Sequence, residues 1–206
     1  MPPKVDTVIL APHIDDEVLG CFSYLDERAF VHCFGAENRS YVSREERIAE
    51  LQRAAGLKGF QWHVSDHSVN SYQCGPLIPE LEARLNELRP ATVLIPQPCY
   101  NQDHRAVYDA AMVATRPHDR NWLVPTVLLY EQPHVFIWPY GYGAFEPTYF
   151  RPIDIAAKLE LYEVYASQMR GHRSPALLTA LAQLRGAAIN VPYAEAFFCK
   201  RKIHLA

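Results

Sequence analysis

Short apolar runs alternate with helical patterns along the first half of the chain, and this alternation limits the fold more than any other feature. The runs that we expect to form strands cover residues 7–10, 30–34, 61–64 and 92–95. The segments that we expect to form helices cover residues 16–25, 43–57, 78–88 and 103–115. Strands separated by helices in this way form βαβ units, which place their strands parallel in one sheet. The sequence therefore predicts an α/β fold with a mainly parallel sheet.

The second half of the chain is less regular. We expect strands at residues 126–130, 148–150 and 195–203, and helices at residues 155–168 and 175–184. Residues 133–147 are rich in Trp, Tyr, Gly and Pro, and we expect them to form a loop over the active face. The chain has 206 residues, of which 49% are hydrophobic, and two halves of it would each have a thin core. We therefore predict a single domain over residues 1–206.

Composition excludes several classes of protein. The formal net charge is −3 and the basic residues are scattered, unlike those of a nucleic-acid-binding protein. Five cysteines without CxxC spacing suggest reduced thiols rather than a disulfide framework. No secretory leader is evident, and no apolar run approaches the ~20 residues that cross a bilayer. We expect a cytoplasmic protein with a small-molecule substrate, and the aromatic second half suggests a homo-oligomer.

Two polar segments follow the first and fourth predicted strands. Residues 11–17 read Ala-Pro-His-Ile-Asp-Asp-Glu, and residues 96–104 end in Asn-Gln-Asp-His. Ligands of open α/β sheets bind beyond the carboxyl ends of the strands, so we expect the two segments to meet at one edge of the sheet. Either segment alone could be a solvated helix cap, but two of them at strand ends favour a metal site.

The residue types in these segments match a catalytic metal centre. Asp15, Asp16 and Glu17 are adjacent acids, and a divalent cation would relieve their repulsion more than a helix N-terminus can. His13, Asp16 and His104 together form the two-histidine, one-carboxylate set of a catalytic zinc site. Iron(II) or cobalt would also suit such a set. With Asp16 on the metal, Asp15 is free to accept a proton from the attacking water.

Residues 11–21, Ala-Pro-His-Ile-Asp-Asp-Glu-Val-Leu-Gly-Cys, resemble the signature of the LmbE-like, or PIG-L, zinc de-N-acetylases. Further segments resemble other motifs of this family in the expected order, namely Arg47-Ile48-Ala49-Glu50, Asp103-His104, Ser167-Gln168, Arg185-Gly186 and Tyr193-Ala194-Glu195-Ala196-Phe197. The resemblance implies a Rossmann-like sheet with helices on both faces and a metal site at the strand C-termini. It also implies that His13, Asp16 and His104 bind zinc and that Asp15 is the general base.

The chain departs from the family pattern at Asn101. At this position the family usually has a histidine that is thought to stabilise the oxyanion or to protonate the leaving amine. An asparagine can donate a hydrogen bond to an oxyanion but cannot donate a proton. His134 is our preferred substitute because an imidazole could do both, and Tyr100 and Tyr142 are alternatives. We therefore expect Asp15, Asn101 and His134 to be catalytic.

Other residues have two interpretations. Arg47, like Tyr100 and Tyr142, is predicted to bind substrate, but it could instead pair with Glu50 or Glu46 on a solvated face. The histidines His63 and His67 flank Asp66 and could imitate a second metal site. An aromatic cluster could stack on a sugar, or could form a lid or a subunit interface. This cluster comprises Phe136, Trp138, Tyr140, Tyr142, Phe145 and Tyr149.

The predicted function is the metal-dependent removal of an acetyl group from the amide nitrogen of an N-acetyl amino sugar or its conjugate. One alternative keeps the zinc but changes the substrate to a non-sugar N-acyl metabolite. A second alternative is a non-catalytic descendant that retains the metal for structure or ligand binding.

Overall fold

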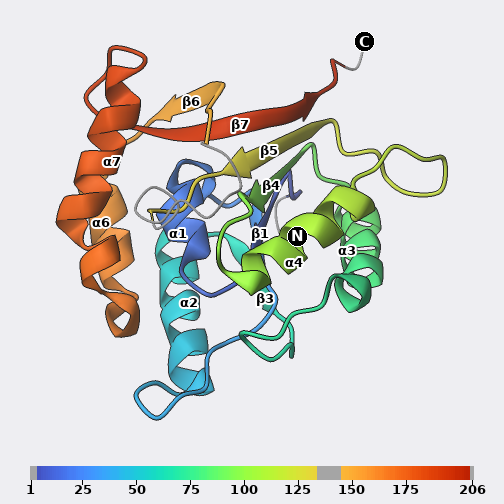
Figure 1. The fold of residues 1–206 in the computed structure, drawn as a ribbon, viewed down its shortest axis with the longest axis horizontal. Coiled ribbons are helices and arrows are strands. Elements are labelled where there is room, and N and C mark those ends of the chain that lie inside the picture. The colour runs from blue at the N-terminus through green and yellow to red at the C-terminus, as the bar shows by residue number, and fades with distance from the viewer. Residues whose placement is uncertain (1–3, 134–144, 205–206) are drawn as a thin grey trace.

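The computed structural model describes residues 4–133 and 145–204, which form a seven-stranded sheet between two layers of helices (Figure 1). The strands lie in the order β3-β2-β1-β4-β5-β7-β6. Their bounds are β1 (Thr7–Ala11), β2 (Ala29–Cys33), β3 (Gln61–Val64), β4 (Thr92–Pro96), β5 (Thr126–Tyr130), β6 (Tyr149–Pro152) and β7 (Ala194–Lys202).

The sheet is parallel from β3 to β5, whereas β7 runs antiparallel to both β5 and β6. The predicted Rossmann-like, mainly parallel sheet is confirmed, and its antiparallel side was not foreseen. The strand order reverses at β1, where Thr7 lies opposite Ala29 of β2 and Thr92 of β4. Such a switch point opens a crevice at the carboxyl ends of the two central strands.

Helices cover both faces of the sheet, as predicted. One face carries α1 (Asp16–Cys21), α2 (Arg44–Lys58), α6 (Ile155–Glu163) and α7 (Pro175–Ala187), and the other carries α3 (Cys74–Leu88) and α4 (Gln102–Ala114). The side chains of β1 alternate between two cores. Ile9 and Ala11 pack with the first group of helices, whereas Val8 and Leu10 pack with the second. This alternation is the expected period of a strand that is buried on both sides.

Four helices differ in length from the prediction, and one of them, α7, ends at Ala187, three residues later than expected. The first ends at Cys21 instead of residue 25, because the carboxylate of Glu195 accepts the N–H groups of Phe22 and Ser23 at 3.0 and 2.8 Å and the chain tightens into a 3₁₀ turn. α6 ends at Glu163, and a second 3₁₀ turn, Ala166–Gln168, follows it. α3 begins four residues early, at Cys74. Pro76 is tolerated in its first turn because the N–H groups there have no intrahelical partner, whereas Pro79 lies inside the helix.

Gly20 allows α1 to lie directly against the sheet. A Cβ atom at this position would collide with the ring of Tyr130 and would lie 2.8 Å from the carbonyl oxygen of Glu131. The close approach brings the turn before α1 over the carboxyl end of β1. Within residues 4–133 and 145–204, no helix combines the length and the apolar character needed to cross a membrane.

Candidate metal centre

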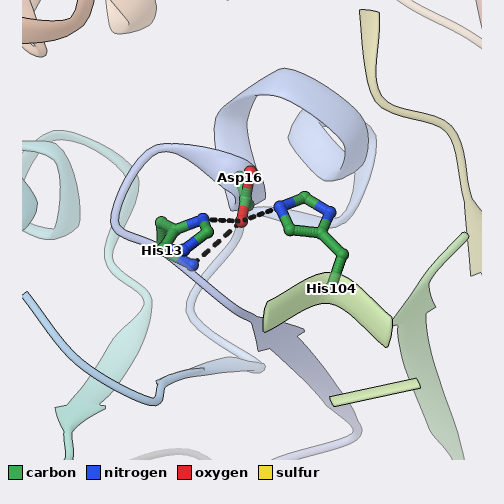
Figure 2. Close-up of side chains that lie close together, drawn as sticks. All are labelled: His13, Asp16 and His104. Atoms are coloured by element: carbon green, nitrogen blue, oxygen red, sulfur yellow. Dashed lines mark hydrogen bonds and ion pairs between the residues drawn. The ribbon is translucent and has the colours of Figure 1, made fainter. Parts of the chain in front are cut away.

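The three predicted metal ligands come together at the switch point of the sheet. His13 and Asp16 lie in the turn between β1 and α1, and His104 lies in the first turn of α4, which follows β4 (Figure 2). One ligand atom from each residue lies within 4.8 Å of the other two. Among the described residues, this is the only group of three His, Cys, Asp or Glu side chains with that arrangement.

Both imidazole rings face the same carboxylate oxygen. Oδ2 of Asp16 lies 3.5 Å from Nδ1 of His13 and 3.4 Å from Nε2 of His104. Dashed lines in Figure 2 mark both contacts. These distances exceed those of good N–H···O hydrogen bonds. The backbone N–H of His13 donates to the same oxygen at 2.9 Å and holds the carboxylate in place. Two nitrogens and an oxygen therefore converge on one point, as the ligands of a small cation do.

Asp103 orients the ring of His13. Its Oδ2 lies 2.9 Å from Nε2 of His13, and its carboxylate also accepts the backbone N–H groups of Asn70 at 2.6 Å and Tyr72 at 3.1 Å. Metal-binding histidines commonly donate their second ring N–H to a carboxylate in this way. The sequence placed Asp103 beside His104 but gave no sign that it contacts His13, because the two residues lie in different segments.

The electrostatics of the centre favour positive charge. Burial alone would lower the pKa of His13, but hydrogen bonds with the carboxylates of Asp103 and Asp16 outweigh it and raise this pKa to about 10. Burial alone would raise the pKa of Asp16, yet the rings of His104 and His13 hold it well below its usual range. The residues that keep a proton on His13 would equally stabilise a divalent cation, whose binding would release that proton. The donor set therefore fits a metal ion.

Asp15 does not share the contacts of Asp16. It occupies the N-cap position of α1 without a capping hydrogen bond from its side chain, and its φ of 109° and ψ of −19° lie in the left-handed region of the backbone map. Its carboxylate, 1% exposed, accepts a hydrogen bond of 2.8 Å from Nη1 of Arg173 and lies 3.9 Å from Nη2 of Arg47. Burial raises the pKa of Asp15 to about 6, although Arg173 and Arg47 oppose this rise.

Glu17, the third adjacent acid, braces the turn. Its carboxylate accepts the backbone N–H of Asp15 at 3.0 Å and the hydroxyl of Tyr165. Burial raises its pKa to about 7, although the bond from Tyr165 opposes the rise. The three acids therefore have separate partners, which relieves the crowding evident in the sequence.

Arg47 is buried rather than solvated. Its guanidinium, 1% exposed, donates to Glu50 on the same helix and to the backbone carbonyl of Ile14, and it also donates to Ser167 at 3.2 Å. The ion pair with Glu50 was one of the two expected interpretations, but the expected solvated face is absent at this position. Arg47 nevertheless lines the cavity beside the metal ligands.

Asn101 is the N-cap residue of α4, and its Oδ1 accepts the N–H of Asp103 at 2.9 Å. Tyr100 beside it is 40% exposed. His134 and Tyr142, with Phe136, Trp138 and Tyr140 of the aromatic cluster, lie outside the described residues.

The cavity at the metal ligands has a volume of about 130 Å³. Among its lining residues are the predicted His13, Asp15, Asp16, Arg47, Tyr100, Asn101 and His104, together with Glu37, Gln168, His172 and Arg173.

Arg173 is the main site residue without a predicted role. Besides Asp15 it contacts Oε1 of Gln168 at 2.9 Å, and Nε2 of Gln168 donates to Glu37 at 2.8 Å. This chain of contacts joins the loop after β2 to the segment that follows α6. The nearby Ser167-Gln168 pair stands out in the sequence because it resembles a family motif. No sequence pattern, however, indicated that Arg173 would contact Asp15.

No protein-family model and no curated protein matches the sequence. Solved structures with the same fold do match. N,N'-diacetylchitobiose deacetylase from Pyrococcus horikoshii is 18% identical, with a TM-score of 0.76 over 94% of this chain and 83% of that chain. The A40926 pseudoaglycone deacetylase Dbv21 is 18% identical, with a TM-score of 0.74 over 98% of this chain and 100% of that chain.

A third structure with this fold has a different named activity. GalB, the 4-carboxy-2-hydroxymuconate hydratase from Pseudomonas putida KT2440, is 18% identical, with a TM-score of 0.71 over 99% of both chains. The resemblance expected from the sequence is therefore confirmed at the level of the fold, which this chain shares with deacetylases and with a hydratase.

Proposed function

We propose that this protein is a metal-dependent hydrolase that removes an acetyl group from the amide nitrogen of an N-acetyl amino sugar or its conjugate. The observation that carries the proposal is the convergence of His13, Asp16 and His104 at the switch point, with the buried carboxylate of Asp15 beside them. The two deacetylases that share the fold support this choice of reaction.

The enzyme would be one domain over residues 1–206. Its five free cysteines fit a cytoplasmic location.

His13, Asp16 and His104 would hold the ion, with zinc as the first choice and iron(II) or cobalt as alternatives. When bound, such an ion polarises an acyl carbonyl and lowers the pKa of a water molecule. Asp103 would keep the ring of His13 oriented for binding, because it holds Nε2 at 2.9 Å while Nδ1 faces Asp16.

Asp15 would move the proton. With a pKa of about 6, its carboxylate is ionised at neutral pH and is basic enough to accept a proton from the attacking water. The water oxygen then bonds to the acyl carbon, and the carbon–nitrogen bond breaks as Asp15 returns the proton to the amine. Acetate and a free amine are the products. Arg173 holds Oδ2 of Asp15 at 2.8 Å and would keep the carboxylate in one orientation during both transfers.

Asn101 would stabilise the oxyanion of the tetrahedral intermediate. Its Oδ1 accepts the N–H of Asp103, so the donor end of the amide is the end that can serve a ligand. His134 remains our proposal for a second proton donor. Tyr100, Tyr142 and Arg47 remain our proposals for substrate contacts.

Water addition to a carbon–carbon double bond is the second candidate reaction. The hydratase that shares the fold favours it. A zinc amidase for a non-sugar N-acyl metabolite would keep the ion and the reaction but change the substrate. A non-catalytic descendant that only binds metal would tolerate the loss of Asp15.

Acetate release by the zinc-loaded protein separates these proposals. The substrates would be N-acetylglucosamine conjugates, simple N-acyl amines and a hydroxymuconate. We expect release from the sugar conjugates, and we expect Asp15→Asn to lower kcat about 10²–10⁴-fold while the metal content is unchanged. Asp119→Asn, which changes an exposed acid in the loop after α4, serves as the matched control. Full activity of the Asp15→Asn variant, or hydration without acetate release, would refute the proposal.

A further inference from the structure

The helix α1 carries the metal ligand Asp16 but is too short to hold its own position. It has six residues, Asp16–Cys21, all of them buried, and the side chain of Asp15 at its N-cap position forms no capping hydrogen bond. Helices shorter than ~12–15 residues are marginal on their own in water. Contacts with the rest of the chain must therefore set where α1, and with it the carboxylate of Asp16, lies.

Two charged side chains from the last part of the chain hold the C-terminal end of α1. Glu195 of β7 accepts the N–H groups of Phe22 and Ser23 at 3.0 and 2.8 Å. Lys158 of α6 donates to the carbonyl oxygen of Leu19 at 2.8 Å and to Oε1 of Glu195 at 2.7 Å. We call this ion pair of Lys158 and Glu195 the α1 clamp. It joins the orange α6 and the red β7 to the blue α1 in Figure 1.

Leu19 connects the α1 clamp to the metal end of the helix. Its carbonyl oxygen accepts the ammonium group of Lys158, and its N–H donates to the carbonyl oxygen of Asp15 at 3.0 Å. A shift of α1 along its axis would therefore break the contact with the clamp and displace Asp15 and Asp16 together. At the metal end, Nε2 of Gln132 donates to the carbonyl oxygen of Asp16 at 3.2 Å, which is a bond between neutral groups. The charged contacts of the clamp are the stronger of the two.

The gain in stability from such a pair is small. Lys158 and Glu195 are 5% and 6% exposed, and moving two charges out of water costs about as much as their attraction contributes. Neutral side chains of similar size often leave a protein equally stable. The cavity beside the pair has a volume of about 20 Å³, which is room for a water molecule but for no larger ligand. What the pair supplies is a set of directional contacts to the backbone of α1.

We propose that Lys158 and Glu195 are positioning residues for the metal centre. By fixing α1 they set the distance between the carboxylate of Asp16 and the ring of His104, which belongs to a different helix. Ligand atoms must be held within about 0.5 Å of their working positions, so a small displacement of α1 would weaken the site. The inference rests on the proposed metal centre, and it adds two residues that contact neither the ion nor the substrate.

Removing both charges together separates positioning from stability. The variant Lys158→Met/Glu195→Gln leaves no buried charge without its partner, so the metal-free protein should unfold at nearly the same urea concentration as the unaltered protein. We expect its affinity for cobalt(II) to fall about tenfold or more, because the carboxylate of Asp16 is held less firmly. The visible absorption of the bound ion, which depends on the geometry of its ligands, should change as well. A pair that served the fold alone would leave this spectrum unchanged.

The ion pair of Arg185 with Glu131 is the matched control. It lines the same small cavity, with Nε of Arg185 2.9 Å from Oε2 of Glu131, but it joins α7 to the end of β5. Glu131→Gln/Arg185→Met should therefore retain the cobalt(II) affinity and the spectrum of the unaltered protein. Equal losses of affinity in the two double variants would overturn the positioning role of the α1 clamp.

Metal binding also separates failure of this inference from failure of the proposed function. Weaker cobalt(II) binding by Lys158→Met/Glu195→Gln would support the positioning role even if no N-acetyl substrate were hydrolysed. If the unaltered protein bound no cobalt(II), the proposed metal centre would fail and the positioning role with it. If both proteins bound the ion equally well and with the same spectrum, only the positioning role would fail.

The single variant Glu195→Gln gives a second reading. Its amide has one acceptor oxygen in place of two, so it cannot accept from Lys158, Phe22 and Ser23 as the carboxylate does. The cobalt(II) spectrum should change in the same direction as in the double variant. An unchanged spectrum in this variant would also overturn the inference.

Discussion

Two clusters of histidine and carboxylate lie at the same edge of the sheet, and only one of them is arranged as a metal site. In the first cluster, His13 and His104 face a single oxygen of Asp16 at 3.4–3.5 Å. In the second, Glu80 of α3 uses its two oxygens separately, with Oε1 2.8 Å from His32 and Oε2 2.7 Å from His67. In the second cluster the imidazoles and the carboxylate form direct hydrogen bonds. In the first, the two imidazole nitrogens stand further from the carboxylate oxygen, and this spacing leaves room for a cation between them.

The comparison shows why residue types alone do not identify a metal centre. The sequence allowed a second site at His63, Asp66 and His67, but these side chains point to different partners. Asp66 pairs with Arg44, His67 bonds Glu80, and the ring of His63 lies against that of His32 with centroids 5.3 Å apart. When two imidazoles each bond a separate oxygen of one carboxylate, their hydrogen-bonding needs are met without a metal ion.

The largest expected effect is on metal content. His104→Ala should lower the bound metal from about one ion per chain to nearly none, because only two ligands remain. His67→Ala is the matched control in the second cluster and should retain the ion. Elemental analysis after dialysis would measure both, with circular dichroism as a check of folding. Loss of metal from the His67→Ala variant alone would reverse our assignment of the two clusters.

Asp103→Asn should have an intermediate effect. The amide retains the size of the side chain, but it is neutral and has one acceptor oxygen for His13, Asn70 and Tyr72, so the ring of His13 is held less firmly. We expect metal affinity to fall about 10–100-fold, as for other partners of metal-binding histidines. Competition with a chelator would measure the affinity. Asp109→Asn on the same helix should bind metal as the unaltered protein does, and equal affinities for all three proteins would contradict the role of Asp103.

The smallest effect concerns the stability that the second cluster contributes. Burial alone would raise the pKa of Glu80, but hydrogen bonds from His32, His67 and Ser65 outweigh it and lower this pKa from 4.5 to about 2. A lowered carboxyl pKa stabilises the folded state above about pH 4.5, and this contribution is lost as the pH falls from 4.5 towards 2. The partial exposure of Glu80 limits the contribution to about 1–2 kcal/mol.

Urea unfolding of Glu80→Gln would measure this contribution. The variant should be less stable than the unaltered protein by about 1–2 kcal/mol at pH 7, and the difference should be smaller at pH 4. Glu87→Gln, which removes an exposed pair with Arg84 on the same helix, should change stability by less than about 0.5 kcal/mol. A difference between Glu80→Gln and the unaltered protein that grew on acidification would contradict the sign of the pKa shift.

Local patterns were enough to predict most of the fold. The β3 strand begins and ends at the predicted residues, and Ser43 caps α2 by accepting the N–H of Glu46, as its capping-box spacing indicated. Local patterns could not predict that β7 runs antiparallel to its neighbours. It depends on pairing with β5 and β6, and a strand that is buried in a sheet has the same apolar pattern in either direction.

The site residues, too, could be predicted where a local pattern marks them but not where they depend on distant contacts. His13, Asp16 and His104 could be proposed because each follows a strand whose end lies at one edge of the sheet. Arg173 could not, because it contacts Asp15 from a segment 158 positions away, and an arginine in a polar loop is unremarkable in a sequence. Residues that support a site through distant contacts leave no local pattern.

The left-handed backbone conformation of Asp15 lowers the stability of the folded chain at the residue that carries the proposed chemistry. Glycine adopts such a conformation at little cost, whereas an L side chain there is strained. Glycine, however, would remove the carboxylate that we propose moves the proton. Under the proposed mechanism, aspartate at this position therefore costs folding energy that glycine would not, and selection for thermal stability alone would replace it.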